Sequence, residues 1–159
     1  MIRVGILTIS DLGSRGERED TAGRALKERV EEVGWSVDRH EIVPDETGVI
    51  SDRLREWADD AGLELILTTG GTGFADRDVT PEATLAVLDK QAPGIPEAMR
   101  AAGQKKTPMA ILSRGVAGIR GRTLVVNLPG SLKGAVESLE AVREALPHAI
   151  DVILGRPGH

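Results

Sequence analysis

Apolar segments of strand length alternate along the chain with helical patterns, and this alternation limits the fold more than any other feature. Residues 2–9 form a nearly continuous apolar run, as expected for a strand buried on both faces. Comparable segments lie at residues 63–68 and 123–128, and residues 35–43 resemble a further strand that is less regular than the first. Amphipathic helical patterns lie between these segments. This order predicts a mostly parallel sheet with helices on both faces, a three-layer α/β sandwich. The 159 residues suit one compact domain over residues 1–159.

Capping residues mark where two of the predicted helices begin or end. The pattern from Ala22 to Val33 places apolar side chains on one helical face, and Gly34 suits a C-terminal stop. Further along, Thr80 is expected to cap a helix, because Pro81 fits the first helical position. Both helices follow a loop that leaves a predicted strand, as the α/β order requires.

The C-terminal half of the chain is less regular. Residues 91–108 contain three prolines, and only Glu97–Ala102 is assigned there, as a helix. A long helix is predicted near the end, with an apolar stripe from Leu132 to Leu146. A short apolar helix around residues 148–154 is expected to finish the chain.

Polar loops follow all four predicted strands. They lie at residues 10–16, 44–46, 69–80 and 127–133. In parallel α/β sheets the carboxyl ends of the strands meet at one edge, and ligands bind beyond that edge. We therefore expect the four loops to form one site.

The most distinctive loop is Thr69-Gly70-Gly71-Thr72-Gly73, which follows a buried strand. Glycine permits positive φ and a close approach of the backbone to a ligand, so successive N–H groups can point at a phosphate. No Gly-Lys-Ser/Thr follows as in a Walker loop, and the glycine spacing is not that of the dinucleotide fingerprint. The pattern favours a nucleotide-phosphate cradle, and a tight strand-to-helix turn stays the alternative.

Acidic residues follow this loop at Asp76, Asp78 and Glu82. Carboxylates beside a phosphate repel it unless a divalent cation lies between them, so the combination suggests Mg²⁺-assisted nucleotide chemistry. Helix capping is the alternative, because an acid near a helix N-terminus stabilises it by about 0.3–1 kcal/mol. Capping explains Glu82 better than function does, whereas Asp78 precedes the helix. Asp45 is either a member of the same site or an ordinary turn aspartate.

Small polar residues stand at two other strand ends. Ser10 and Asp11 follow the first strand, where an N-capping role is the simple explanation. Pro129 and Gly130 precede Ser131, which opens the last long helix. Ser131 is either the cap of that helix or part of an anion site at its N-terminus.

Local positive charge occurs at Lys133, at Ser113-Arg114 and at Arg120-Gly121-Arg122. Guanidinium groups hold phosphate through two hydrogen bonds, so an anionic substrate is one explanation of the arginines. A solvated or subunit-facing loop is the other, and for Lys133 a solvated side chain is the default. The three histidines show no ligand spacing, and we assign them no chemistry.

Composition excludes several classes of function. There is no cysteine, so disulfides, thiol catalysis and zinc–thiolate sites are excluded. A net charge of −5 and an aromatic content of 2% argue against nucleic acid as a partner. The N-terminus lacks the pattern of a signal peptide, and no apolar run approaches the roughly 20 residues that span a bilayer. We expect a cytoplasmic protein with no nucleic-acid or membrane partner.

The Gly-Gly-Thr-Gly loop is followed by Phe74 and then by Arg77-Asp78-Val79-Thr80-Pro81-Glu82-Ala83, a highly specific run. On this run the chain resembles the molybdopterin adenylyltransferase family, and the resemblance covers nearly the whole sequence. The other matching pieces are Ser10-Asp11 with Gly16 and Asp20, Val43-Pro44-Asp45-Glu46, Leu112-Ser113-Arg114-Gly115 and Asn127-Leu128-Pro129-Gly130-Ser131.

The resemblance implies both a fold and an activity. The fold is that of the molybdopterin-binding domain, and the family is typically homotrimeric. The activity is transfer of AMP from ATP to the terminal phosphate of molybdopterin, with Mg²⁺ and with release of pyrophosphate. The two essential acids of the family match Asp45 and Asp78, to which we assign the positioning of the metal and the phosphates. Thr69 and Gly70–Gly73 then hold the nucleotide, and a molybdate-insertion protein is a candidate partner.

The resemblance also assigns the substrate side of the site. Ser113, Arg114, Ser131 and Lys133 are expected to face the pterin phosphate or dithiolene. The remaining substrate-binding residues are expected to be Ser10, Asp11, Pro129 and Gly130.

Leu132 departs from the family, which usually has proline after Pro-Gly-Ser, but leucine there suits the predicted apolar stripe. Related bacterial proteins named MoaB share most of these motifs. A non-catalytic module for molybdopterin binding or assembly therefore stays the alternative to an enzyme. Retention of both acids beside an intact loop favours the enzyme.

Overall fold

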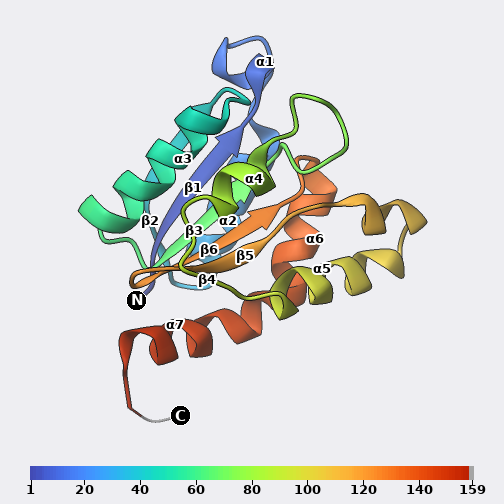
Figure 1. The fold of residues 1–159 in the computed structure, drawn as a ribbon. Coiled ribbons are helices and arrows are strands. Elements are labelled where there is room, and N and C mark those ends of the chain that lie inside the picture. Colours follow the sequence, from blue (N-terminus) through green and yellow to red (C-terminus); the bar gives the residue numbers. More distant parts are fainter. Residues whose placement is uncertain (158–159) are drawn as a thin grey trace.

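The computed structural model describes residues 1–157 and shows a six-stranded sheet with helices on both faces (Figure 1). The strands are β1 (Arg3–Ile9), β2 (Ser36–Val43), β3 (Leu65–Thr69), β4 (Lys90–Gln91), β5 (Ala117–Arg120) and β6 (Thr123–Leu128). The α-helices are α1 (Asp11–Ser14), α2 (Thr21–Glu32), α3 (Thr47–Arg55), α4 (Thr80–Leu85), α5 (Gly94–Gln104), α6 (Leu132–Val142) and α7 (Leu146–Leu154). Shorter helical segments are η1 (Glu56–Asp60), η2 (Pro108–Leu112) and η3 (Arg143–Ala145). The predicted three-layer α/β fold is confirmed.

The sheet has the order β2-β1-β3-β6-β5-β4. The four predicted strands are β2, β1, β3 and β6, and they pair in parallel. The sequence did not predict β5 and β4, which add an antiparallel edge. These two strands are four and two residues long, and Ala117-Gly118-Ile119-Arg120 lacks the apolar run that marks β1, β3 and β6. Their place in the sheet comes from pairing with β6 rather than from their own composition.

The strand order creates a crevice at the carboxyl end of β1. The chain leaves β1 through α2 to β2 on one side, and then crosses through α3 to β3 on the other side. The connections at the ends of β1 and β3 therefore leave in opposite directions. Open α/β sheets bind ligands at such a switch point.

Alternate residues of the strands fill two separate cores. One face packs Val4, Ile6 and their neighbours against α2, α5, α6 and α7. The other face packs Leu7 and Ile66 against α3, η1 and α4, which lie on the near side of the sheet in Figure 1. Because both faces are covered, the central strands β1, β3 and β6 are buried almost throughout, as their continuous apolar sequence indicates.

The last long helix ends earlier than predicted. α6 stops at Val142, and η3 separates it from α7, to which Leu146 belongs. Pro147 explains the break, because its ring clashes with the carbonyl group four residues earlier, that of Arg143. Leu132 does not join the apolar stripe, since its side chain is 48% exposed.

Thr80 does not cap α4 as predicted. The N-cap residue is Val79, which makes no side-chain capping bond, and Thr80 is the first helical residue. The amide of Thr80 donates to the carbonyl oxygen of Gly71 at 3.1 Å, and its hydroxyl is buried without a hydrogen-bond partner. Pro81 lies in the first turn, but as the second helical residue and not the first as predicted. The glycine-rich loop, rather than a capping side chain, thus fixes the start of this helix.

The outer edge of the sheet at β2 is highly charged. Asp38, Arg39, His40 and Glu41 follow one another in this eight-residue strand, which has a neighbour on one side only. Within residues 1–157, no helix is long and apolar enough to cross a membrane.

Candidate active site

The carboxyl ends of the four parallel strands meet, as the sequence predicts. Ile9 of β1 is in register with Val43 of β2, and Thr69 of β3 is in register with Leu128 of β6. The loops that follow these residues therefore lie at one edge of the sheet. Asn127 belongs to β6, as the predicted strand 123–128 implies, and its side-chain amide donates to two buried threonine hydroxyls below this edge.

A polar hollow of about 350 Å³ lies at the switch point between β1 and β3. It brings together many of the predicted residues from all four loops. Its lining includes Ser10, Asp45, Thr69, Gly70, Gly71, Asp78, Gly130 and Ser131. We call it the polar hollow.

The glycine-rich loop presents bare backbone to the polar hollow. Gly70 has φ of 105° and Gly71 has φ of 66°, in the left-handed region that favours glycine. A Cβ atom at Gly70 would meet the carbonyl oxygen of Ile9, and one at Gly71 would meet the hydroxyl of Thr80. Thr69 fixes the loop from below, because its hydroxyl donates to the carbonyl oxygen of Pro129 at 2.6 Å. These glycines are therefore required for geometry, whatever the ligand.

The second half of the loop does not line the polar hollow. Thr72 is buried, and the carbonyl groups of Thr72 and Gly73 accept hydrogen bonds from Arg114. Of the five residues predicted to bind nucleotide, the structure thus places Thr69, Gly70 and Gly71 at the hollow and gives the other two a supporting position.

Asp45 and Asp78 both line the polar hollow, although they come from different loops. One carboxylate oxygen of Asp45 accepts from the amide of Asp11 at 2.8 Å. One carboxylate oxygen of Asp78 accepts from the amide of Ala75 at 3.0 Å. Burial raises the pKa of Asp45, and the nearby charges of Asp11 and Asp78 add to this effect. A positive charge brought into the hollow would relieve that repulsion.

Asp11 points away from the hollow toward Arg77. The guanidinium donates to both carboxylate oxygens, at 3.0 and 2.9 Å. These hydrogen bonds lower the pKa of Asp11 to about 2. The pair joins the loop after β1 to the loop after β3, so Asp11 acts on the site through its neighbours and not as a lining residue.

Both predicted serine caps are present. Ser10 accepts from the amide of Gly13, and Ser131 accepts from the amide of Gly134. Each serine also lines the polar hollow, so capping and a place in the site are not exclusive.

Asp20 and Arg18 also line the polar hollow, and the sequence interpretation assigns neither of them a role. Asp20 accepts hydrogen bonds from the hydroxyl of Thr8, the amide of Gly23 and the ring of His40. Burial opposes its ionisation, but these bonds outweigh burial and lower its pKa. Arg18 is exposed and lines the same hollow, and within residues 1–157 it makes no ion pair. A free arginine in a polar loop gives no signal of its own in one sequence.

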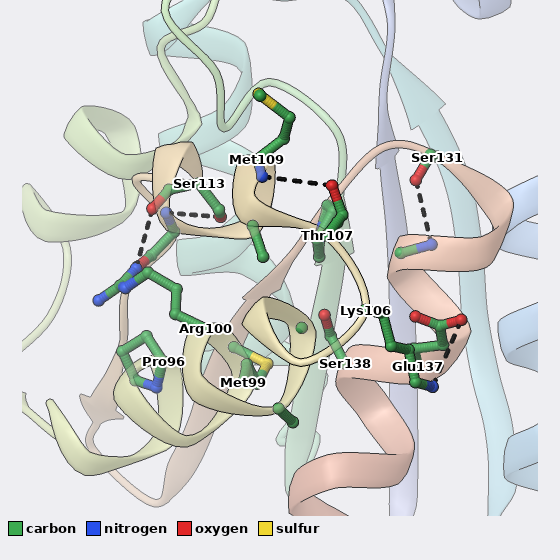
Figure 2. Close-up of a pocket in the computed structure, with 16 residues that line it drawn as sticks. Pro96, Met99, Arg100, Lys106, Thr107, Met109, Ser113, Ser131, Glu137 and Ser138 are labelled. Carbon is green, nitrogen blue, oxygen red and sulfur yellow. Dashed lines mark hydrogen bonds and ion pairs between the residues drawn. The ribbon is translucent and has the colours of Figure 1, made fainter.

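Figure 2 shows a second hollow, which has a volume of about 250 Å³. Side chains of α5, η2 and α6 surround it, among them Met99 and Met109. Arg100 also lines it and donates to the carbonyl oxygens of Ser113 and Gly115, at 3.0 and 3.1 Å. Ser131 lines both hollows. We call this second one the apolar hollow.

The predicted basic residues are dispersed. Lys133 is 81% exposed and lines neither hollow, and its nearest acid is Glu137 at 3.9 Å. Arg114 lines neither hollow and bonds to protein atoms instead. Arg120 pairs with Asp59 and lines neither hollow. Ser113 lines the apolar hollow.

The acids of the polar hollow fit a metal ion that enters together with a nucleotide. They fit less well a metal ion that the protein alone would hold. Within residues 1–157, no group of three or more His, Cys, Asp or Glu side chains could hold a metal ion. Mg²⁺ in nucleotide sites is commonly bound by one or two carboxylates together with substrate phosphates and water. Asp45 and Asp78 satisfy that requirement.

Fold and site together define an α/β protein with a polar hollow at the switch point of its sheet, where two carboxylates lie beside a glycine-rich backbone. The model of one family, described as the probable molybdopterin binding domain, matches residues 5–148. The chain belongs to this family.

Characterised relatives are similar over most of their length. A molybdopterin adenylyltransferase of Helicobacter pylori strain J99 is 46% identical over 156 residues, which cover 97% of this chain and 89% of the relative. The molybdopterin adenylyltransferase of Escherichia coli K12 is 44% identical, over 91% of this chain and 75% of the relative. Among solved structures, the molybdopterin biosynthesis enzyme MoaB of Thermus thermophilus has a TM-score of 0.92 and 59% identity, covering 99% of both chains.

Proposed function

We propose that this chain is a molybdopterin adenylyltransferase of molybdenum cofactor biosynthesis, which uses ATP as co-substrate and Mg²⁺ as cofactor. One observation carries the proposal: Asp45 and Asp78 face the bare backbone of Gly70 and Gly71 across a single hollow. The names of the relatives that are 44–46% identical support the same activity.

The polar hollow is the proposed place of the ATP phosphates. Backbone at Gly70 and Gly71 approaches the ligand closely, since no side chain intervenes. Gly130 and Ser131 add the N-terminal end of α6, where free N–H groups favour an anion. Arg18 supplies a charge opposite to that of the phosphates.

The reaction joins the terminal phosphate of molybdopterin to the α-phosphorus of ATP. An oxygen of the molybdopterin phosphate forms the new bond, the bond to the β-phosphate oxygen breaks, and pyrophosphate leaves with the electron pair. Such a transfer needs little covalent participation from the protein, because positioning and charge neutralisation lower its barrier. Asp45 and Asp78 would hold Mg²⁺, which when bound neutralises phosphate charge and offsets the repulsion between the phosphates and these acids.

The apolar hollow is the proposed place of the pterin. Ser113, Pro129 and Ser131 line it, and Ser131 also lines the polar hollow. A substrate that lies across Ser131 would place its phosphate toward Gly130 and its ring system against Met99 and Met109. Lys133 stands exposed at the start of α6, where it would meet the molybdopterin phosphate or dithiolene only from solvent.

Assembly and location follow from the same proposal. We place the protein in the cytoplasm as a homotrimer that passes its product to a molybdate-insertion protein. The alternative is a MoaB-type module that holds molybdopterin without catalysis. Both acids and the loop beside them are present, which such a module would not require, and this favours the enzyme.

The test is release of pyrophosphate from ATP, Mg²⁺ and authentic molybdopterin. We expect release that depends on all three components, with adenylyl-molybdopterin identified by mass spectrometry. A folded protein that binds molybdopterin but releases no pyrophosphate would support the non-catalytic module instead.

A further inference from the structure

Asp78 lies at the end of a segment that has few bonds of its own. Residues 74–77 are exposed, and Phe74 is 72% exposed. Inside the segment, the amide of Asp78 donates to the carbonyl oxygen of Ala75 at 2.9 Å. The amide of Ala75 in turn donates to the carboxylate of Asp78 at 3.0 Å. Exposed segments of this kind are mobile unless outside contacts fix them. The position of the Asp78 carboxylate therefore depends on what holds residues 73–78.

Arg114 holds both ends of this segment. Its Nε donates to the carbonyl oxygen of Gly73, and its Nη2 donates to the carbonyl oxygen of Asp78, each at 2.7 Å. Its backbone amide also donates to the carbonyl oxygen of Thr72 at 2.8 Å. One side chain thus joins both ends of the loop 73–78, and the pair that Arg77 makes with Asp11 is a further outside contact of this loop.

Arg114 is itself fixed on two sides. Its Nη1 donates to the Glu82 carboxylate at 2.7 Å, and this hydrogen bond lowers the pKa of Glu82. Arg100 donates to the carbonyl oxygens of Ser113 and Gly115, the two neighbours of Arg114. Glu82 lies in α4 and Arg100 in α5, so the guanidinium has little freedom to turn toward a ligand.

The geometry assigns Arg114 as a positioning residue that holds residues 73–78 and so sets the place of Asp78. The guanidinium forms a planar fork with several donors, and here it reaches two carbonyl groups and one carboxylate together. A lysine ammonium is a single point of charge on a flexible stem and does not reproduce that arrangement. The effect of Arg114 on turnover rests on the proposed function, whereas its effect on the position of residues 73–78 does not.

The first test follows the segment directly. Phe74 is the only phenylalanine of the chain, so labelling with fluorophenylalanine places a single ¹⁹F signal inside residues 73–78. We expect the signal of Arg114→Gln and of Arg114→Lys to shift and sharpen, because the segment becomes mobile. Arg120→Gln is the matched control. Arg120 also bonds one carboxylate and one backbone carbonyl group, those of Asp59 and Val87, but no residue of the segment.

The second test separates positioning from ligand binding. We expect Arg114→Lys to lower kcat at least about tenfold and to change KM for ATP and for molybdopterin less than about threefold. Glu82→Gln should lower kcat less than Arg114→Lys does, since the two carbonyl contacts of Arg114 remain. Circular dichroism and the thermal midpoint of each variant show that the fold is retained.

The outcomes are distinct. An unchanged ¹⁹F signal in Arg114→Gln overturns the inference, whatever the activity. A raised KM with unchanged kcat overturns it as well, because Arg114 would then act as a substrate ligand. If the unsubstituted protein releases no pyrophosphate, the proposed function fails, and the ¹⁹F signal alone decides whether Arg114 holds the segment.

Discussion

Asp11 and Asp45 are 34 residues apart in the sequence and exchange hydrogen bonds, each carboxylate accepting from the other's backbone amide. The amide of Asp11 donates to Asp45 at 2.8 Å, and the amide of Asp45 donates to Asp11 at 3.0 Å. The exchange joins the loops after β1 and β2 and holds Asp45 at the polar hollow. Arg77 completes the link to the loop after β3. Residues from three loops thus share one hydrogen-bond network.

We predict that Asp78→Asn lowers kcat about 100-fold or more, with little change in the affinity for ATP or molybdopterin. Asparagine keeps the shape of the side chain and loses the charge that, in the proposed function, holds Mg²⁺. Pyrophosphate release and equilibrium binding are the two measurements. Asp76→Asn is the control, because Asp76 is an exposed acid of the same loop that lines neither hollow. Equal losses in the two variants would show that charge in the loop matters, and not the position of Asp78.

We predict that Asp45→Asn makes the protein more stable at pH 7 while it abolishes turnover. Burial raises the pKa of Asp45, so the ionised carboxylate destabilises the native state above that pKa. Asparagine removes this penalty, and we expect a gain of about 0.5–2 kcal/mol in urea unfolding. The difference in unfolding free energy between variant and parent should disappear as the pH falls below about 4, where Asp45 is protonated in the unfolded chain as well. An Asp45→Asn variant that is less stable than the parent at pH 7 would contradict the predicted direction of the change in stability.

We predict that the Asp11 carboxyl titrates with a midpoint of about 2 in a carboxyl-detected NMR experiment. The hydrogen bonds from Arg77 favour the ionised form, so their contribution to stability is complete above the unfolded pKa of about 4. It is lost as the pH falls through about 2. Arg77→Gln should return the midpoint toward 3.8, whereas Arg24→Gln, which removes a pair with Glu19, should leave it unchanged.

We predict that Gly70→Ala destabilises the protein by about 1–3 kcal/mol, because φ is 105° there and a Cβ atom would meet the Ile9 carbonyl group. Gly48→Ala is the matched control. Gly48 lies in α3 with open space around its Cα, so alanine should stabilise by roughly 0.4–1 kcal/mol. Urea unfolding measures both, and a loss for Gly48→Ala or none for Gly70→Ala would contradict the loop geometry.

We predict that Arg18→Gln raises KM for ATP about three- to tenfold and leaves kcat nearly unchanged, as expected for an exposed charge that contacts phosphate in ground and transition states alike. The effect should fade at high ionic strength. Arg29→Gln, on the exposed face of α2, is the control. Identical KM values for parent and Arg18→Gln would remove Arg18 from the site.

The sequence predicts the fold and the site well where the signal is local. The apolar runs identify β1, β3 and β6, and a less regular segment identifies β2. The polar residues after these strands identify the four loops that meet at the hollow. The prediction fails where structure depends on partners distant in sequence. β5 is a strand because β6 lies beside it, and Thr80 is no cap because Gly71 holds its amide.

The direction in which a site side chain points is harder to predict from the sequence than the loop that carries it. Arg114 appears basic and ligand-facing in the sequence, but its partners are 32 to 41 residues away and belong to the protein. Asp11 has the residue type of a ligand, but its carboxylate is used by Arg77 and Asp45. No single-sequence pattern distinguishes a charge that binds substrate from one that holds a neighbouring loop.

The charges of β2 also limit how copies of this chain meet. Addition of a further strand beside Asp38, Arg39, His40 and Glu41 would remove these side chains from water against an unmatched neighbour. Consecutive charges of this kind protect an open edge from pairing with another chain. Growth of the sheet from its β2 edge into another copy is therefore disfavoured, which leaves the short β4 as its other open edge.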